Sequence, residues 1–193
     1  MSSIIKEMFS TPVWIIDDVY TDPREISQQA LLRIQSKNLT PPKWQCNSLS
    51  TYSYDSQLHK STDFKPLIDK VMESVNQYTQ HYWKMNSRMI NCWANLSKSL
   101  HFQEQHHHLG ISPLQVSAVY YSQVQDNEKL TFHPPFTNFS VFGEHFEKID
   151  IKTNRLVIFP AYLEHSFRPV VRTIDKISLS FNFELDLLPT STV

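Results

Sequence analysis

The sequence predicts an α+β fold in which N-terminal helices pack on one face of a double sheet of antiparallel strands. Apolar residues recur at helical spacing in the first part of the 193-residue chain. From residue 89 onward they alternate with polar residues, as in half-buried strands. The chain has only 2 glycines, so Asn, Asp and Pro must shape its turns.

The N-terminal part of the chain is expected to support the sheet. Residues 9–16 have the pattern of a short strand. An N-cap and a proline in the first turn, Pro23, begin a helix that should run to about Gln35. Residues 37–60 are polar and irregular, which is typical of a loop. A second helix is expected from about 63 to 84, with its apolar stripe packed on a sheet.

Short strands with turns between them dominate the second half of the chain. They are expected at residues 89–95, 115–121, 129–132, 155–159 and 176–183. Strands of this kind favour a jelly roll, which closes its own edges and leaves a mouth for a ligand. We expect a single domain over residues 1–193, with residues 1–88 as support and residues 89–185 as the jelly-roll core.

Composition excludes several classes of protein. Hydrophobic residues make up 40% of the chain, too many for a disordered protein. The net charge of −1 argues against bulk attraction to nucleic acid. The 2 cysteines are too few for a disulfide framework and fit a reducing compartment. Because no apolar run approaches the ~20 residues of a membrane span, we expect a cytoplasmic protein without a membrane partner.

Histidines cluster in the middle of the chain. Seven of the 9 lie between His101 and His165. The run of three at residues 106–108 could be surface decoration, a metal-sequestering tract or a pair of ligands. On a strand, His106 and His108 would point to the same side. His165, just after a buried strand, could complete a set of three that leaves positions open, as in non-haem iron or catalytic zinc sites.

The last predicted strand has an unusual polar face. Four residues share it: Lys176, Ser178, Ser180 and Asn182. Such a face usually meets water. If it lines the jelly roll instead, Lys176 needs a partner, which a ligand with a distal carboxylate would supply. A second set could line the same cavity: Asn91, Trp93 and Asn95.

Five short motifs between residues 89 and 183 occur in the same order as in a known protein family. They are Trp93-Ala-Asn95, His106-His-His108, Ser117-Ala-Val-Tyr-Tyr121, Arg155-Leu-Val-Ile-Phe-Pro160 followed by His165, and Lys176-Ile-Ser178-Leu-Ser-Phe-Asn182. Together they resemble small bacterial and phage 2-oxoglutarate/iron(II)-dependent oxygenases. That resemblance implies the double-stranded β-helix, a cupin-like jelly roll.

The resemblance also implies roles for particular residues. The implied catalytic metal ligands are His106, His108 and His165. The implied 2-oxoglutarate contacts are Lys176, Ser178, Asn95 and Tyr121. Two positions depart from the wider superfamily. His108 stands where a carboxylate is usual, and Lys176 replaces an arginine, so a point charge replaces a bidentate fork.

The implied reaction is hydroxylation of an unidentified small molecule or protein side chain by O2, with 2-oxoglutarate converted to succinate and CO2. Fe(II) is the implied metal, and ascorbate the reductant. A homodimer is common in similar enzymes, and the resemblance suggests a bacterial cell or a phage-infected host. Two alternatives stay open. One is a non-catalytic metal-binding jelly roll, and the other is a three-histidine metal dioxygenase that does not use 2-oxoglutarate.

Overall fold

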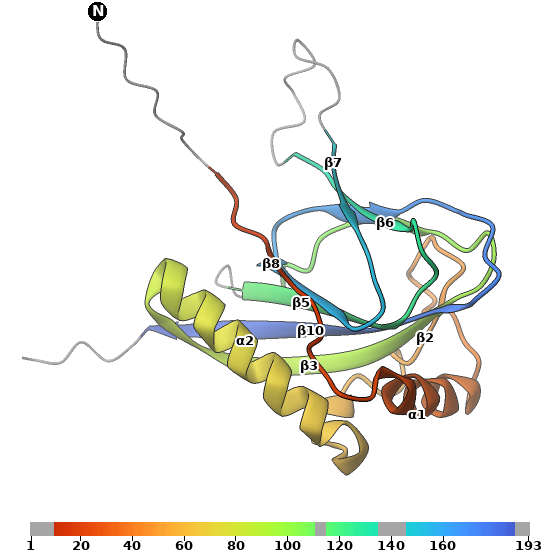
Figure 1. The fold of residues 1–193 in the computed structure, drawn as a ribbon, viewed down its shortest axis with the longest axis horizontal. Coiled ribbons are helices and arrows are strands. Elements are labelled where there is room, and N and C mark those ends of the chain that lie inside the picture. The colour runs from red at the N-terminus through yellow and green to blue at the C-terminus, as the bar shows by residue number, and fades with distance from the viewer. Residues whose placement is uncertain (1–9, 111–114, 135–145, 188–193) are drawn as a thin grey trace, which may run out of the picture.

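Two antiparallel sheets form the framework of the computed structural model, which describes residues 10–110, 115–134 and 146–187. The six-stranded sheet has the order β1 (Trp14–Ile16), β8 (Arg155–Pro160), β5 (Gln115–Gln123), β10 (Lys176–Leu187), β3 (Met85–Ser97) and β2 (Leu49–Ser50). The four-stranded sheet has the order β4 (Gln103–His106), β9 (His165–Phe167), β6 (Lys129–Phe132) and β7 (Glu147–Asp150). Figure 1 shows the two sheets stacked.

The chain passes repeatedly from one sheet to the other. β3, β5, β8 and β10 lie in the larger sheet, whereas β4, β6, β7 and β9 lie in the smaller one. These eight strands therefore form two four-stranded layers wound as a double-stranded β-helix, with β1 and β2 added at the edges of one layer. The predicted jelly roll is confirmed.

Two helices cover the outer face of the larger sheet, as predicted (Figure 1). α1 (Pro23–Gln35) begins at Asp22, whose carboxylate accepts hydrogen bonds from two backbone N–H groups of the first turn. α2 (Lys65–Trp83) follows two 3₁₀ turns, η1 (Leu58–Lys60) and η2 (Thr62–Phe64). It ends at Lys84, where a left-handed φ of 54° stops the helix.

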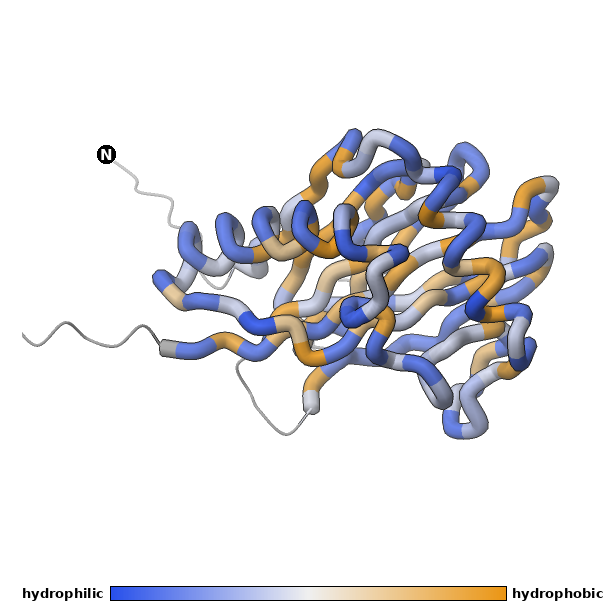
Figure 2. The backbone as a smooth tube through the Cα atoms, turned by 90° about the horizontal axis from the view of Figure 1, so that it is seen from below, coloured by the Kyte–Doolittle hydropathy of each residue, from blue (hydrophilic) through white to orange (hydrophobic). Residues whose placement is uncertain are grey.

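Two apolar cores hold these layers together. The larger core joins both helices to outward-facing strand residues such as Leu179 and Phe181. The smaller core lies between the sheets and includes Val157 and Phe159. Figure 2 shows hydrophobic and hydrophilic segments following one another along the backbone of the strands and helices. Because side chains alternate along β10, burying Phe181 against the helices turns Ser180 into the space between the sheets.

The structure differs from the sequence prediction mainly in the smaller sheet. β4, β7 and β9 were not predicted, because strands of three or four mostly polar residues carry too little alternation. Only part of the strand predicted at residues 9–16 forms β1, and residue 9 lies outside the described residues. In the part of the chain that the structure describes, no helix is both long enough and apolar enough to cross a membrane.

Candidate metal centre

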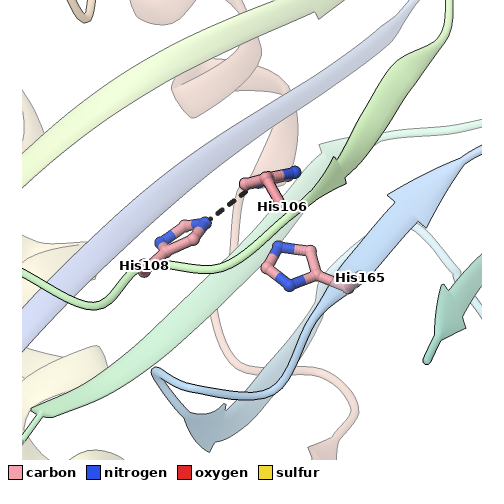
Figure 3. A group of neighbouring side chains, drawn as sticks. All are labelled: His106, His108 and His165. Atoms are coloured by element: carbon pink, nitrogen blue, oxygen red, sulfur yellow. Dashed lines mark hydrogen bonds between the residues drawn. The ribbon is translucent and has the colours of Figure 1, made fainter. Parts of the chain in front are cut away.

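Three histidines from two neighbouring strands of the smaller sheet converge between the sheets. β4 ends at His106 and β9 begins at His165, and these two residues are register partners. His108 lies two residues beyond β4. One ring nitrogen from each histidine lies within 4.8 Å of the others. Figure 3 shows the three imidazoles turned toward one another, with Nε2 of His106 3.2 Å from Nε2 of His108.

Backbone carbonyls orient two of the rings. Nδ1 of His106 lies 2.8 Å from the carbonyl oxygen of Glu104. Nδ1 of His165 lies 3.0 Å from that of Leu163. A carbonyl oxygen only accepts hydrogen bonds, so each Nδ1 must carry the proton. In a neutral ring the Nε2 lone pair is then free to face the centre of the cluster.

A side chain orients the third ring. Nδ1 of His108 lies 2.8 Å from Oδ1 of Asn182 on β10. The same Oδ1 accepts a hydrogen bond of 2.9 Å from the hydroxyl of Ser117 on β5. The amide of Asn182 is therefore held from the β5 side while its oxygen faces His108. All three rings thus direct Nε2 inward.

Burial keeps the three imidazoles neutral. It lowers the pKa of His108 to about 3, with a further contribution from neighbouring His106. Burial lowers the pKa of His165 well below its usual value. It also lowers the pKa of His106. Neutral imidazole is the form that binds metals, so the ligand set needs no deprotonation near pH 7.

The cluster fits a metal ion. Two imidazole nitrogens about 2.1 Å from a metal and at right angles to each other are about 3.0 Å apart, close to the separation of His106 and His108. With the protons on Nδ1, two lone pairs face each other at this distance, an arrangement that a cation stabilises. Three nitrogen ligands on one side of an ion leave the other side open, as in non-haem iron sites.

A cavity of about 470 Å³ adjoins the histidines, and Lys176 lines it. Lys176 is only 4% exposed. Its Nζ lies 3.1 Å from the ring centroid of Phe167, and no described residue accepts a hydrogen bond from it. Burial lowers the pKa of this ammonium to about 7, while Glu128 raises it and Arg172 lowers it. Lys176 is thus a buried amine that is protonated below about pH 7 and has no hydrogen-bonded counterion among the described residues.

The acid near Lys176 is already paired. Both carboxylate oxygens of Glu128 accept hydrogen bonds of 2.7 Å from the guanidinium of Arg172. The two side chains are 3% and 1% exposed. Arg172 also donates to the carbonyl oxygens of Lys98 and His101. Because Arg172 neutralises Glu128, the charge of Lys176 remains available to a ligand. Sequence reasoning missed this ion pair, since nothing local marks residues 44 positions apart.

The other residues expected to bind 2-oxoglutarate differ in their surroundings. Ser178 lines the cavity and is 6% exposed. Asn95 also lines it, but its amide accepts from Ser50 at 2.8 Å and donates to Ser180 at 3.0 Å. That pairing indicates a role in joining β2, β3 and β10. Tyr121 is the register partner of Ser178, and its hydroxyl is buried without a hydrogen-bond partner among the described residues.

The three consecutive histidines do not behave as one strand. Only His106 belongs to β4, so the assumption that a strand holds both His106 and His108 is wrong. Both rings nevertheless reach the cluster. His107 is exposed, and its Nδ1 accepts from the backbone N–H of Leu109 at 3.2 Å. It stands outside the group of three ligand nitrogens.

A family comparison covers this region. The family model described as "Putative 2OG-Fe(II) oxygenase" matches residues 91–182, which contain all three histidines, Lys176 and Ser178. A search of curated proteins found no match.

Solved structures agree in fold. A prolyl hydroxylase from Trichoplax adhaerens, in complex with a hypoxia inducible factor peptide fragment, is 13% identical with a TM-score of 0.65, over 89% of this chain and 83% of that one. A prolyl-4-hydroxylase from Pseudomonas putida is 14% identical with a TM-score of 0.62, over 91% and 93%. HygX from Streptomyces hygroscopicus, with nickel, 2-oxoglutarate and hygromycin B bound, is 13% identical with a TM-score of 0.61, over 94% and 84%.

The architecture and the histidine group define a jelly-roll protein whose cavity has a group of three histidines that fits a metal ion. The family match adds that residues 91–182 are similar to the 2-oxoglutarate and iron(II)-dependent oxygenases.

Proposed function

We propose that this oxygenase hydroxylates a small molecule or a protein side chain, using His106, His108 and His165 to hold Fe(II) and Lys176 to hold 2-oxoglutarate. Iron and 2-oxoglutarate supply the oxidising chemistry with O2, and the products are succinate, CO2 and a hydroxylated substrate. Ascorbate is the proposed reductant in assays. A cytoplasmic setting is also proposed, and the two free buried cysteines are consistent with it.

The protein side chains position the reactants. The carbonyls of Glu104 and Leu163 and the amide of Asn182 hold the imidazoles with Nε2 inward. Lys176 and Ser178 would bind the distal carboxylate of 2-oxoglutarate, because both line the cavity and neither has a hydrogen-bonded acid partner in the described residues. Phe167 covers the ammonium of Lys176 and keeps water from it.

Tyr121 completes the proposed carboxylate site. Its hydroxyl is a buried donor without an acceptor, on a strand position paired with Ser178. A buried hydroxyl without a partner costs free energy unless a ligand accepts its hydrogen bond. A carboxylate held by Lys176 would accept it. Asn95 is left out of this site, because its amide is already engaged.

One observation carries this proposal: the same cavity holds three inward-facing imidazoles and an uncompensated buried ammonium. The metal group alone would suit several metalloenzymes. The ammonium adds a requirement for an anion that reaches beyond the metal. A dicarboxylate with a chelating 2-oxo acid at one end satisfies both sites at once.

The test is succinate formation from 2-oxoglutarate by purified protein with Fe(II), ascorbate and O2, without added substrate. We expect slow turnover that His165→Ala and Lys176→Met abolish. His107→Ala is the matched control, because this exposed ring stands between two proposed ligands and should leave turnover intact. Loss of turnover in His107→Ala but not in His106→Ala or His108→Ala would contradict the ligand assignment.

A calorimetric titration covers the case in which turnover needs a substrate. Zn(II)-loaded protein should bind 2-oxoglutarate, and Lys176→Met should not. If the loaded wild type fails to bind 2-oxoglutarate, the site belongs to a metal protein that does not use this co-substrate.

A further inference from the structure

An aromatic wall leads from the histidine cluster to the surface. The ring centroids of Trp93 and His108 are 5.6 Å apart. The ring centroids of Tyr52 and Trp93 are 5.0 Å apart, and those of Trp44 and Tyr52 are 5.5 Å apart. Trp93 is 4% exposed and Tyr52 is 42% exposed, so the three rings run from the interior to solvent. All three line the cavity, and we call them the aromatic wall.

The aromatic wall stands apart from the proposed carboxylate site. Along β3 and β10, Trp93 is paired with Ser180 while Ser97 is paired with Lys176. Trp93 is therefore four residues along β3 from Ser97, the residue opposite Lys176, and this spacing corresponds to about 13 Å along the strand. A ligand that reaches Lys176 leaves the aromatic wall free for a second molecule.

Acceptor atoms accompany the aromatic wall. Glu104 lines the cavity, and its Oε1 accepts from the backbone N–H of Gln45 at 3.0 Å, next to Trp44. Its Oε2 is buried without a hydrogen-bond partner in the described residues. Oδ1 of Asn91, also on the cavity wall, is likewise buried and unpartnered. These atoms accept hydrogen bonds, so they suit a donor on the ligand.

The acidic side chains that line the cavity leave one negative charge without a basic partner in the part of the chain that the structure describes. Two carboxylates line the cavity, Glu104 and Glu184, and Arg88 neutralises the second. Among the residues that the structure describes, Lys176 is the only lysine or arginine that lines the cavity. Glu104 therefore has no basic partner within salt-bridge distance in the described chain. Among these residues, the carboxylate of Glu104 therefore lacks a cationic partner and lies beside the aromatic wall.

We infer that the mouth binds an organic cation, an ammonium or guanidinium group of the substrate, between Glu104 and the aromatic wall. Aromatic faces attract cations, and a half-buried carboxylate such as that of Glu104 forms a charge-assisted hydrogen bond with them. Because Glu104 is two residues before His106, their Cα atoms are at most about 7 Å apart. The oxidised carbon should thus lie within a few bonds of the cationic group. This inference rests on the proposed function, since it assigns that cation to the substrate.

Binding measured without turnover tests the inference. Zn(II)- and 2-oxoglutarate-loaded protein is titrated calorimetrically with Nα-acetylarginine N-methylamide, its uncharged citrulline analogue, and spermidine. We expect an organic cation to bind at least tenfold more tightly than the citrulline analogue. Preference for the arginine probe would indicate a peptide substrate, and preference for spermidine a free amine. If the citrulline analogue binds as tightly as both cations, the inference is wrong.

Variants separate the contributions of charge and aromatic faces. Glu104→Gln should weaken cation binding about tenfold or more while keeping the backbone carbonyl that orients His106. Trp44→Leu should weaken it about two- to fivefold. Glu147→Gln is the control, because Glu147 is exposed on β7 and does not line the cavity. Equal affinity in Glu104→Gln and wild type would overturn the assignment of the carboxylate.

The two proposals can fail separately. Cation binding that depends on Glu104, in a protein that makes no succinate and binds no 2-oxoglutarate, would leave the cation site standing and remove the proposed function. Succinate formation without any preference for cations would leave the proposed function standing and remove the cation site.

Discussion

Oδ1 of Asn182 lies 2.8 Å from Nδ1 of His108, so a residue on β10 determines how a proposed metal ligand beyond β4 is oriented. The strand that carries Lys176 and Ser178 at one end carries this amide near its middle. One strand thus takes part in both the proposed metal site and the proposed 2-oxoglutarate site, which couples their relative positions. The carbonyls that orient His106 and His165 cannot be removed by substitution, but this amide can.

Asn182→Ala should lower metal affinity about 10- to 100-fold, because His108 loses the acceptor that holds its Nδ1 proton. Asn182→Asp should restore affinity, since a carboxylate oxygen accepts the same hydrogen bond. Ser117→Ala removes the hydroxyl that holds this amide but leaves the acceptor in place, so its affinity should lie between those of wild type and Asn182→Ala. Calorimetric titration with Zn(II) or Co(II) measures all four proteins. Full affinity in Asn182→Ala would show that the amide does not orient the ring.

Tyr121→Phe should affect stability and 2-oxoglutarate binding in opposite directions. The variant removes a buried hydroxyl without a partner, so the free energy of unfolding should rise by about 1 kcal/mol. It also removes a donor to the proposed carboxylate, so 2-oxoglutarate affinity should fall about tenfold. Urea unfolding and calorimetry report the two effects. Unchanged 2-oxoglutarate affinity would exclude the hydroxyl from the site.

Strand patterns along the sequence were enough to predict β3, β5, β8 and β10 of the larger sheet, whereas β2 lies in the expected loop of residues 37–60. The alternating apolar residues of β10, Leu179 and Phe181 among them, face the helices, so its polar residues had to face the other sheet. The smaller sheet escaped prediction, because β9 has three residues and β4 has the sequence Gln-Glu-Gln-His. Their position depends on pairing across the fold, which no local pattern records.

The histidine group was predictable in composition but not in geometry. Spacing and resemblance singled out His106, His108 and His165, and the structure brings them together. The orientation of the rings depends on Glu104 and Leu163, which belong to no motif, and on Asn182, whose place in the last motif did not indicate this role. Trp93 was expected to line the cavity, but its contact with Tyr52 and, through it, Trp44 was not, because these two residues lie more than 40 residues away in sequence.

Arg172→Met should destabilise the protein by about 3–5 kcal/mol, because it leaves the carboxylate of Glu128 buried without a partner. The double variant Glu128→Gln/Arg172→Met should recover part of that loss, since it buries no charge at this pair. Urea unfolding of Arg172→Met, Glu128→Gln and the double variant gives the coupling free energy between the two residues. A single variant within 1 kcal/mol of wild type would mean that water reaches Glu128.

Lys176→Met should stabilise the ligand-free protein at pH 7 and below. Burial lowers the pKa of Lys176 from 10.5 to about 7 in the folded state. Between these values the unfolded chain binds a proton that the folded chain lacks, so wild-type stability rises with pH from about 7 to 10. The advantage of the methionine variant, on the order of a few kcal/mol, should be fully present below pH 7 and should shrink toward pH 10. Thermal unfolding across this range measures it, and a constant difference would contradict the lowered pKa.

Affinity for 2-oxoglutarate should fall as pH rises above about 7. The carboxylate needs the ammonium form of Lys176, which the folded protein loses above its lowered pKa of about 7. Each further pH unit should then weaken binding up to tenfold, because binding must take up a proton. Lys176→Arg supplies the contrast, since a guanidinium stays charged throughout this range. Calorimetric titration of Zn(II)-loaded protein between pH 6 and 9 should show this decline in wild type and a flat profile in Lys176→Arg. Parallel declines in both proteins would place the titrating group elsewhere than on Lys176.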